Sequence, residues 1–236
     1  MQPGPANSFI VLLLRESTPH TERMSAADFL LSPEVQKLLK VAYAGADSQF
    51  PVRALAKATR LDEDEVQRTL DHLVTSGILT RHKARGDEPE AFGVNSQFIF
   101  HAELRSIALK SFAGAEPLRA MLRSRFKDSV LRAFVLGEDD AGTIEVLIVH
   151  GQKAPEQSAM SEAIHKLSRA TRRNFAVHVI SHTRYGALNA RDSLHARLAD
   201  GSAFEIIKPG DSKAQAPMER TGFLHSARKK LAALAG

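Results

Sequence analysis

The feature that most constrains the fold is a change from helical to strand-like spacing of apolar residues between positions 32 and 94. Three short segments carry apolar side chains three, four and seven positions apart, which is the spacing of one helix face. The first begins at Ser32-Pro33, where a capping residue precedes a proline suited to the first helical position, and Gly45 ends it. The second covers residues 52–59. This part of the chain therefore begins with short, packed helices.

A third helix is expected between Asp62 and Gly77. The side chain of Asp62 can cap this helix, and Glu65, three residues later, completes a capping-box spacing. Residues 78–83 and 90–94 then have strand-like composition on either side of a polar turn that contains glycine and proline. The pattern predicts a β-hairpin with a polar tip, packed on three helices.

Residues 98–127 predict a helical connector in two pieces, because the apolar spacing is helical on both sides of Gly114. A chain of 236 residues suits two domains of ordinary size, and this connector separates residues 25–97 from residues 128–211. The apolar side chains of its first piece form a face that could pair two subunits: Phe100, Leu104, Ile107 and Ala108.

Residues 128–211 predict an α/β domain, since buried-strand patterns alternate with a helical one. The expected elements are strands at 130–136, 144–149 and 175–181, a loop at 137–142 and a helix at 157–173. The whole chain is therefore expected to be of the α+β class. Residues 1–24 are expected to form a mobile arm or an edge strand, and residues 212–236 a basic tail with a helix at 218–234.

Composition places the chain among soluble globular proteins, with 43% hydrophobic and 25% charged residues. The absence of cysteine excludes disulfides and thiolate metal sites and fits a reducing cytoplasm. The longest apolar run, residues 9–14, is short of the roughly 20 residues of a spanning helix, and no basic segment precedes it as in a signal peptide. We expect a cytoplasmic protein without a cofactor. No metal site is expected, because His178 and His182 would lie too far apart on one strand.

The formal net charge of +5 favours a polyanionic partner, but the charge is unevenly distributed. Residues 25–97 hold 9 Lys/Arg against 11 Asp/Glu, a net of −2, whereas residues 98–127 hold 6 against 2 and residues 212–236 hold 5 against 1. The basic residues therefore concentrate in the connector and the tail.

Several short segments of the second and third helices and of the start of the hairpin form a recognisable pattern: Leu55-Ala56-Lys57-Ala58, Leu61-Asp62, Val66-Gln67-Arg68-Thr69-Leu70, Leu73 and Gly77-Ile78-Leu79. With these segments the first domain resembles the winged helix-turn-helix regulators of the MarR and ArsR type. In such a domain the second and third helices cross closely at small residues, so that the third presents its outer face to the DNA major groove. The resemblance implies binding of double-stranded DNA by a transcription regulator, as a homodimer.

Candidate DNA-binding residues lie on the third helix and in the hairpin. Gln67 and Arg68 are best placed for base edges, because an amide can bond adenine and a guanidinium can bond guanine; His72 lies one turn further on. In the hairpin, four basic residues are expected to contact phosphates: Arg81, His82, Lys83 and Arg85.

The acidic first turn of the third helix departs from this family. Four consecutive carboxylates, residues 62–65, suit the helix dipole but would repel the phosphates of DNA. Either an acid reads a cytosine amino group, or binding depends on the hairpin and on dimerisation. An adaptor that binds protein instead of DNA is a further alternative.

The order of elements from residue 118 to residue 211 is similar to that of the minimal nucleotidyltransferases of the polymerase-beta superfamily. That family has Gly-Ser after its first strand, Asp-x-Asp on the second and a third Asp on the third, and these carboxylates hold two magnesium ions. Here the three positions read Gly137-Glu138, Thr143-Ile144-Glu145 and His178. A shifted alignment would use Asp139 and Asp140, which fall in the loop before the strand.

The resemblance implies an inactive nucleotidyltransferase-like domain, because a lone Glu145 cannot hold two divalent ions. No catalytic residue is therefore assigned, and the vestigial nucleotide pocket would comprise Gly137, Glu138, Glu145 and His178. Such a domain could bind a small-molecule or nucleotide effector, or assemble the dimer. The alternative function is an antitoxin-like nucleotidyltransferase that modifies a partner protein.

Overall fold

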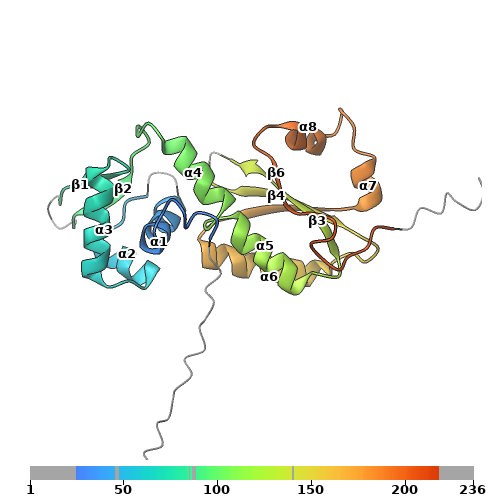
Figure 1. Ribbon diagram of the computed structural model, residues 1–236, viewed down its shortest axis with the longest axis horizontal. Helices are drawn as coiled ribbons and strands as arrows, with labels where there is room; N and C mark the ends of the chain where they lie inside the picture. The colour runs from blue at the N-terminus through green and yellow to red at the C-terminus, as the bar shows by residue number, and fades with distance from the viewer. Residues whose placement is uncertain (1–24, 46–47, 85, 87–88, 140, 218–236) are drawn as a thin grey trace, which may run out of the picture.

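The structure is a computed structural model that describes residues 25–45, 48–84, 86, 89–139 and 141–217 (Figure 1). It confirms the α+β class. Four expectations lie outside the described residues: the N-terminal arm, the positions of Arg85 and Asp140, and the helix at 218–234. Along the longest axis of the molecule, the helical half with its hairpin lies at one end and a four-stranded sheet lies at the other, with α4 (His101–Lys110) between them (Figure 1).

The first half has the expected order of elements, three helices and then a hairpin. Ser32 caps the first helix by accepting from the amide of Val35 at 3.4 Å, and Asp62 caps the third by accepting from the amide of Glu65 at 2.7 Å. The elements are α1 (Pro33–Ala42), α2 (Val52–Thr59), α3 (Glu63–Thr75), β1 (Leu79–His82) and β2 (Ala91–Val94). The predicted caps are confirmed.

The core of this half forms where the three helices and the hairpin meet. Leu39, Val66 and Leu70 are completely buried in it, and Phe92 of β2 is buried beside them. β1 and β2 pair antiparallel with Leu79 opposite Val94. Gly77 has a φ of 77°, a left-handed conformation that glycine adopts without strain, and it turns the chain from α3 into β1.

The connector is two helices, α4 (His101–Lys110) and α5 (Ala115–Arg125), broken at Gly114 as expected. A Cβ on Gly114 would lie 2.7 Å from the carbonyl oxygen of Leu109, so only glycine fits this break. Leu104 and Ala108 pack into the core of the first half. The apolar face expected to pair two subunits is therefore largely used inside the chain, although 57% of Phe100 remains exposed.

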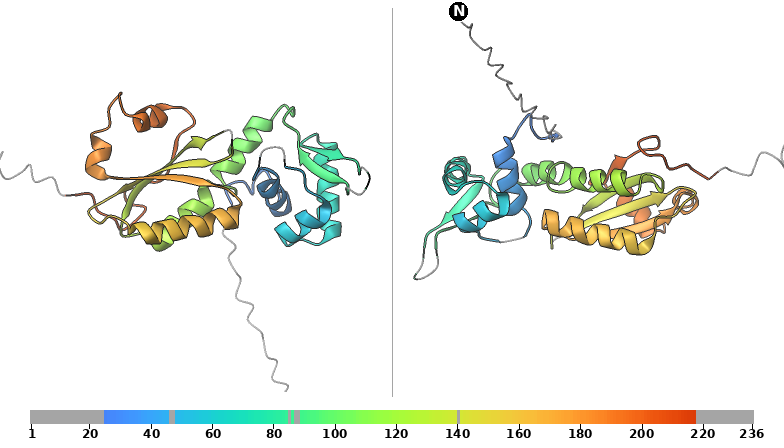
Figure 2. Two further views of the ribbon diagram at one scale, coloured as in Figure 1. Left: turned by 180° about the vertical axis from the view of Figure 1, so that it is seen from behind. Right: turned by 90° about the horizontal axis from the view of Figure 1, so that it is seen from below.

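The second half is a four-stranded mixed sheet with helices on both faces. The elements are β3 (Val130–Glu138), β4 (Ile144–His150), α6 (Gln157–Thr171), β5 (Phe175–Ser181), α7 (His182–Gly186), α8 (Ser193–Ala199) and β6 (Phe204–Ile207). The strand order is β5-β4-β3-β6, in which β4 runs parallel to β5 and β3 runs antiparallel to both β4 and β6. Helices α5 and α6 cover one face, whereas α7 and α8 lie over the other (Figure 2).

Several boundaries expected in this half were wrong. Gly137 and Glu138 belong to β3, not to a loop, because they pair with Glu145 and Ile144 across a register irregularity. The helix ends at Thr171, since the next residue turns left-handed with a φ of 56°. His182 begins α7 and is not part of a strand. The sequence patterns also did not predict α7, α8 or β6.

None of the helices in the described part of the chain is long and apolar enough to cross a membrane.

Truncation of a core residue in α3 is expected to destabilise the protein. Leu70→Ala removes a completely buried side chain and should lower the free energy of unfolding by about 2–5 kcal/mol, measured by urea denaturation. Leu30→Ala is the matched control, because 56% of Leu30 is exposed, and its effect should stay within about 0.5 kcal/mol. Equal effects of the two substitutions would contradict this assignment of the core.

Candidate functional site

The outer face of α3 carries two of the candidate DNA-binding side chains in the open. Arg68 and His72 are exposed, and Gln67 is half-buried and donates to Asp71 Oδ1 at 3.0 Å. The face therefore offers a guanidinium and an imidazole to a partner, while the amide of Gln67 is already engaged within the helix.

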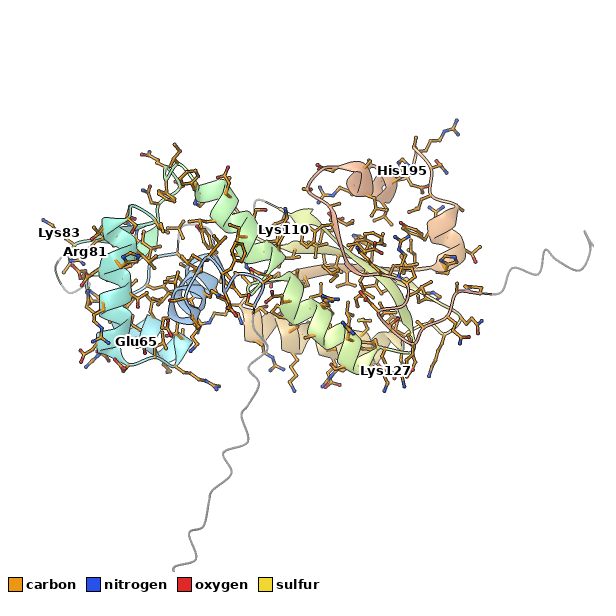
Figure 3. The ribbon with its side chains drawn as sticks, viewed as in Figure 1. Glu65, Arg81, Lys83, Lys110, Lys127 and His195 are labelled. Atoms are coloured by element: carbon orange, nitrogen blue, oxygen red, sulfur yellow. The ribbon has the colours of Figure 1, made fainter. Side chains whose placement is uncertain are left out.

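The acidic first turn of α3 is partly occupied by contacts of its own. Asp62 caps the helix, and Glu63 lies 3.6 Å from the guanidinium of Arg53. Figure 3 shows Glu65 near one end of α3, whereas Arg81 and Lys83 of the hairpin segment lie beside the other end. The carboxylates and the basic hairpin side chains are thus separated along the helix.

The hairpin residues point to different sides. Arg81 pairs with Asp71 of α3 and its guanidinium lies 5.4 Å from the centre of the Phe92 ring, so carboxylate and aromatic contacts already hold it. His82 is on the opposite face, with Nε2 3.0 Å from the hydroxyl of Thr80. Lys83, just beyond β1, is exposed. Of the described hairpin candidates, Lys83 is the one whose charge is most available to a phosphate.

The four residues of the expected nucleotide pocket fall on two faces of the sheet. In the pairing of β3 with β4, Gly137 lies opposite Glu145 and Glu138 lies opposite Ile144. Successive residues of a strand point to opposite faces of the sheet. Gly137, Glu145 and His178 therefore come together on the face beneath α8, and Glu138 lies on the other. The structure brings three of the four residues together.

Glu145 is held by an imidazole and a guanidinium. Its Oε1 lies 3.1 Å from His178 Nε2, and its Oε2 pairs with Arg197 of α8. A Cβ on Gly137 would lie 3.2 Å from the hydroxyl of Ser202, so the loop after α8 closes tightly over this end of the strand. Glu145 is thus neutralised by the chain itself. Among the described residues there is no cluster of three or more potential metal ligands.

Glu138 forms a second, more buried cluster. Only 7% of its side chain is exposed, and it pairs with Arg105 of α4 at 3.1 Å and with the fully buried Arg173. Burial lowers the pKa of Arg173, and the Glu138 carboxylate opposes this lowering. Glu138 therefore acts as the counter-ion of two guanidiniums and does not present an uncompensated negative charge to a ligand.

Sequence patterns missed Arg105, Arg173 and Arg197, the three cations that hold the candidate carboxylates. Arg173 was expected as the last residue of the helix at 157–173, but the left-handed turn at Arg172 ends α6 before it and Arg173 is buried. Asp139, considered as a possible catalytic acid, accepts from the amide of Thr143 at 2.7 Å and stabilises the turn between β3 and β4.

No family model, curated protein or solved structure matches the chain.

The Glu138–Arg173 pair is expected to be strongly coupled. Glu138→Gln leaves a buried guanidinium with a weaker counter-charge, so the substitution should cost about 3–5 kcal/mol of unfolding free energy. Arg173→Met should cost a similar amount, and the double variant should lose clearly less than the sum in a double-mutant cycle.

The control for this cycle is Glu63→Gln, which breaks the exposed contact with Arg53 and should change stability by less than about 1 kcal/mol. Additive effects of Glu138→Gln and Arg173→Met would show that the two side chains do not act as a pair.

Proposed function

We propose that the chain is a DNA-binding transcription regulator with a winged helix-turn-helix domain and a catalytically inactive, nucleotidyltransferase-like second domain. The observation that carries the proposal is the arrangement of the first half: three short helices, an antiparallel hairpin after the third, and exposed Arg68 and His72 on the outer face of that third helix. A helix of this kind, beside a hairpin with basic residues, suits insertion into a major groove.

The contacts of the acidic turn support this proposal. Asp62 is engaged as a cap and Glu63 lies near Arg53, which reduces the negative charge that α3 presents to DNA. Arg68 would read a base edge, and Lys83 and Arg85 would contact phosphates. Six Lys/Arg between residues 98 and 127 would add to the attraction.

The proposal includes a homodimer on a two-fold symmetric site, with recognition helices about 34 Å apart. Because Leu104 and Ala108 of α4 pack inside the chain, a contact between two subunits would depend on apolar side chains that remain exposed next to this helix. Ile99 is 81% exposed and Phe100 57% exposed, and two adjacent apolar side chains of this kind suit a symmetric contact.

The inactive state of the second domain is supported by the partners of Glu145. A metal site of the transferase type needs several free carboxylates on one face. Of the positions that correspond to the family's carboxylates, Glu145 alone carries one; Arg197 already pairs with it, and His178 lies 3.1 Å away. This domain would serve in effector binding or assembly.

DNA binding is tested by first sequencing genomic fragments that the purified full-length protein retains, then titrating a retained fragment in gel-shift assays at several salt concentrations. Arg68→Ala should weaken binding about 5- to 150-fold, the 1–3 kcal/mol of a base contact. Lys83→Ala and Arg85→Ala should each lower the salt slope by about 1.

The matched control in this series is Arg169→Ala, an exposed arginine on α6 and outside the three helices and the hairpin of the first half, which should leave affinity and slope unchanged. If Arg68→Ala and Arg169→Ala behave alike, the proposed recognition face is wrong.

Nucleotidyl transfer is tested with labelled ATP, magnesium and protein acceptors. We expect no label on the chain or on any acceptor, and the same result with Glu145→Gln and with Arg197→Ala, because freeing one carboxylate does not create a two-metal site. Label transfer that disappears in Glu145→Gln would establish the antitoxin-like alternative.

A further inference from the structure

A cleft lies between the hairpin and the end of β3, where the two halves of the molecule approach each other. Its volume is about 270 Å³, and its walls come from α1, the hairpin, α4 and the β3–β4 turn. The side chains that matter for its chemistry are Tyr43, His82, His101, Arg105 and Glu138. It is separate from the Glu145 cluster, which lies on the other face of the sheet.

Two polar atoms from the walls of this cleft are buried without a partner among the described residues: the hydroxyl of Tyr43 and Nδ1 of His101. Tyr43 is only 7% exposed, and burial raises the pKa of its phenol to about 12, so the hydroxyl keeps its proton and can donate. The two rings lie 5.8 Å apart. Unpaired buried polar groups are rare because they are costly, and an acceptor atom of a ligand would satisfy this donor.

The charges beside the cleft favour an anionic ligand. Glu138 contributes one carboxylate, but Arg105 and Arg173 both pair with it. Arg105 lines the same cleft as Tyr43, and its positive charge partly opposes the rise of the Tyr43 pKa. An oxyanion between these groups would accept from the phenol and be attracted by the guanidinium.

The size of the cleft limits the ligand to about one ring, since about 270 Å³ is just below the usual range for small-molecule sites. Gly93 of β2 keeps the space open: a Cβ there would lie 3.3 Å from His82 Nε2 and 3.6 Å from the backbone oxygen of Ser48. Because His82 is on β1, an occupant would contact the hairpin directly.

We propose that this cleft binds a small organic anion, with a carboxylate or phosphate group held by the Tyr43 hydroxyl and His101 and the body of the ligand against His82 and Gly93. Binding of the anion to this cleft does not depend on DNA. A role for the ligand as the effector of the regulator rests on the proposed function.

The test uses the full-length protein without DNA and four probes that share one phenyl ring: benzoate, phenyl phosphate, neutral benzamide and cationic benzamidine. Ligand-observed NMR titration should give saturable binding of at least one of the two anions, and the comparison of benzoate with phenyl phosphate identifies the preferred group. Benzamide and benzamidine should bind at least 5-fold more weakly.

Tyr43→Phe should weaken binding of the preferred anion about 5- to 10-fold, the effect of one hydrogen bond. Gly93→Ala, which narrows the cleft without removing a polar group, should also weaken it. Tyr185→Phe makes the same chemical change on the far side of the sheet, beside Arg132, and should have no effect. Absence of anion binding, equal binding of the neutral probe, or indifference to Tyr43→Phe would overturn the proposal.

A gel-shift titration with the preferred anion at saturation separates this proposal from the proposed function. Anion binding by a protein that retains no DNA supports the cleft site and overturns the regulator. Retention of DNA without anion binding overturns the cleft site alone. A change of DNA affinity with the anion present, lost in Tyr43→Phe, supports both.

Discussion

The two guanidiniums that meet on Glu138 hold the molecule together at its middle. Arg105 reaches the carboxylate from the connector helix α4, and Arg173 reaches it from the segment after α6, so one nearly buried side chain at the end of β3 joins three parts of the fold. Buried ion pairs depend strongly on geometry, because each charge has lost its water. This cluster therefore ties α4 to the sheet, beside the packing of Leu109 into the core of the sheet half.

The local structure of the first half was largely predictable, because its signals are local. Ser32 and Asp62 cap the helices that they were expected to cap, and the hairpin begins and ends within two residues of its expected bounds. In the second half the apolar runs predicted β4, α6 and β5 well. They did not predict β6, a short strand that is specified by pairing with β3 about 70 residues earlier and not by a pattern of its own.

The candidate sites show the same limit. Gly137, Glu138, Glu145 and His178 were grouped from their positions at strand ends, and strand alternation separates Glu138 from the other three. The arginines that neutralise both carboxylates come from α4, α8 and the turn after α6, and no spacing in the sequence connects them to their partners. The partners of a charged side chain depend on tertiary packing, which residue types alone do not reveal. The exposed side chains of α3 were easier to predict, since helical periodicity alone places them.

Ala108 and Leu109 are neighbours on α4, yet the first packs into the core of the helical half and the second into the core of the sheet half. Unfolding of either core would fray this last turn of α4, and the apolar surface of the remaining core would then be exposed. The two halves are therefore expected to melt together, as one cooperative unit, even though each has a core of its own.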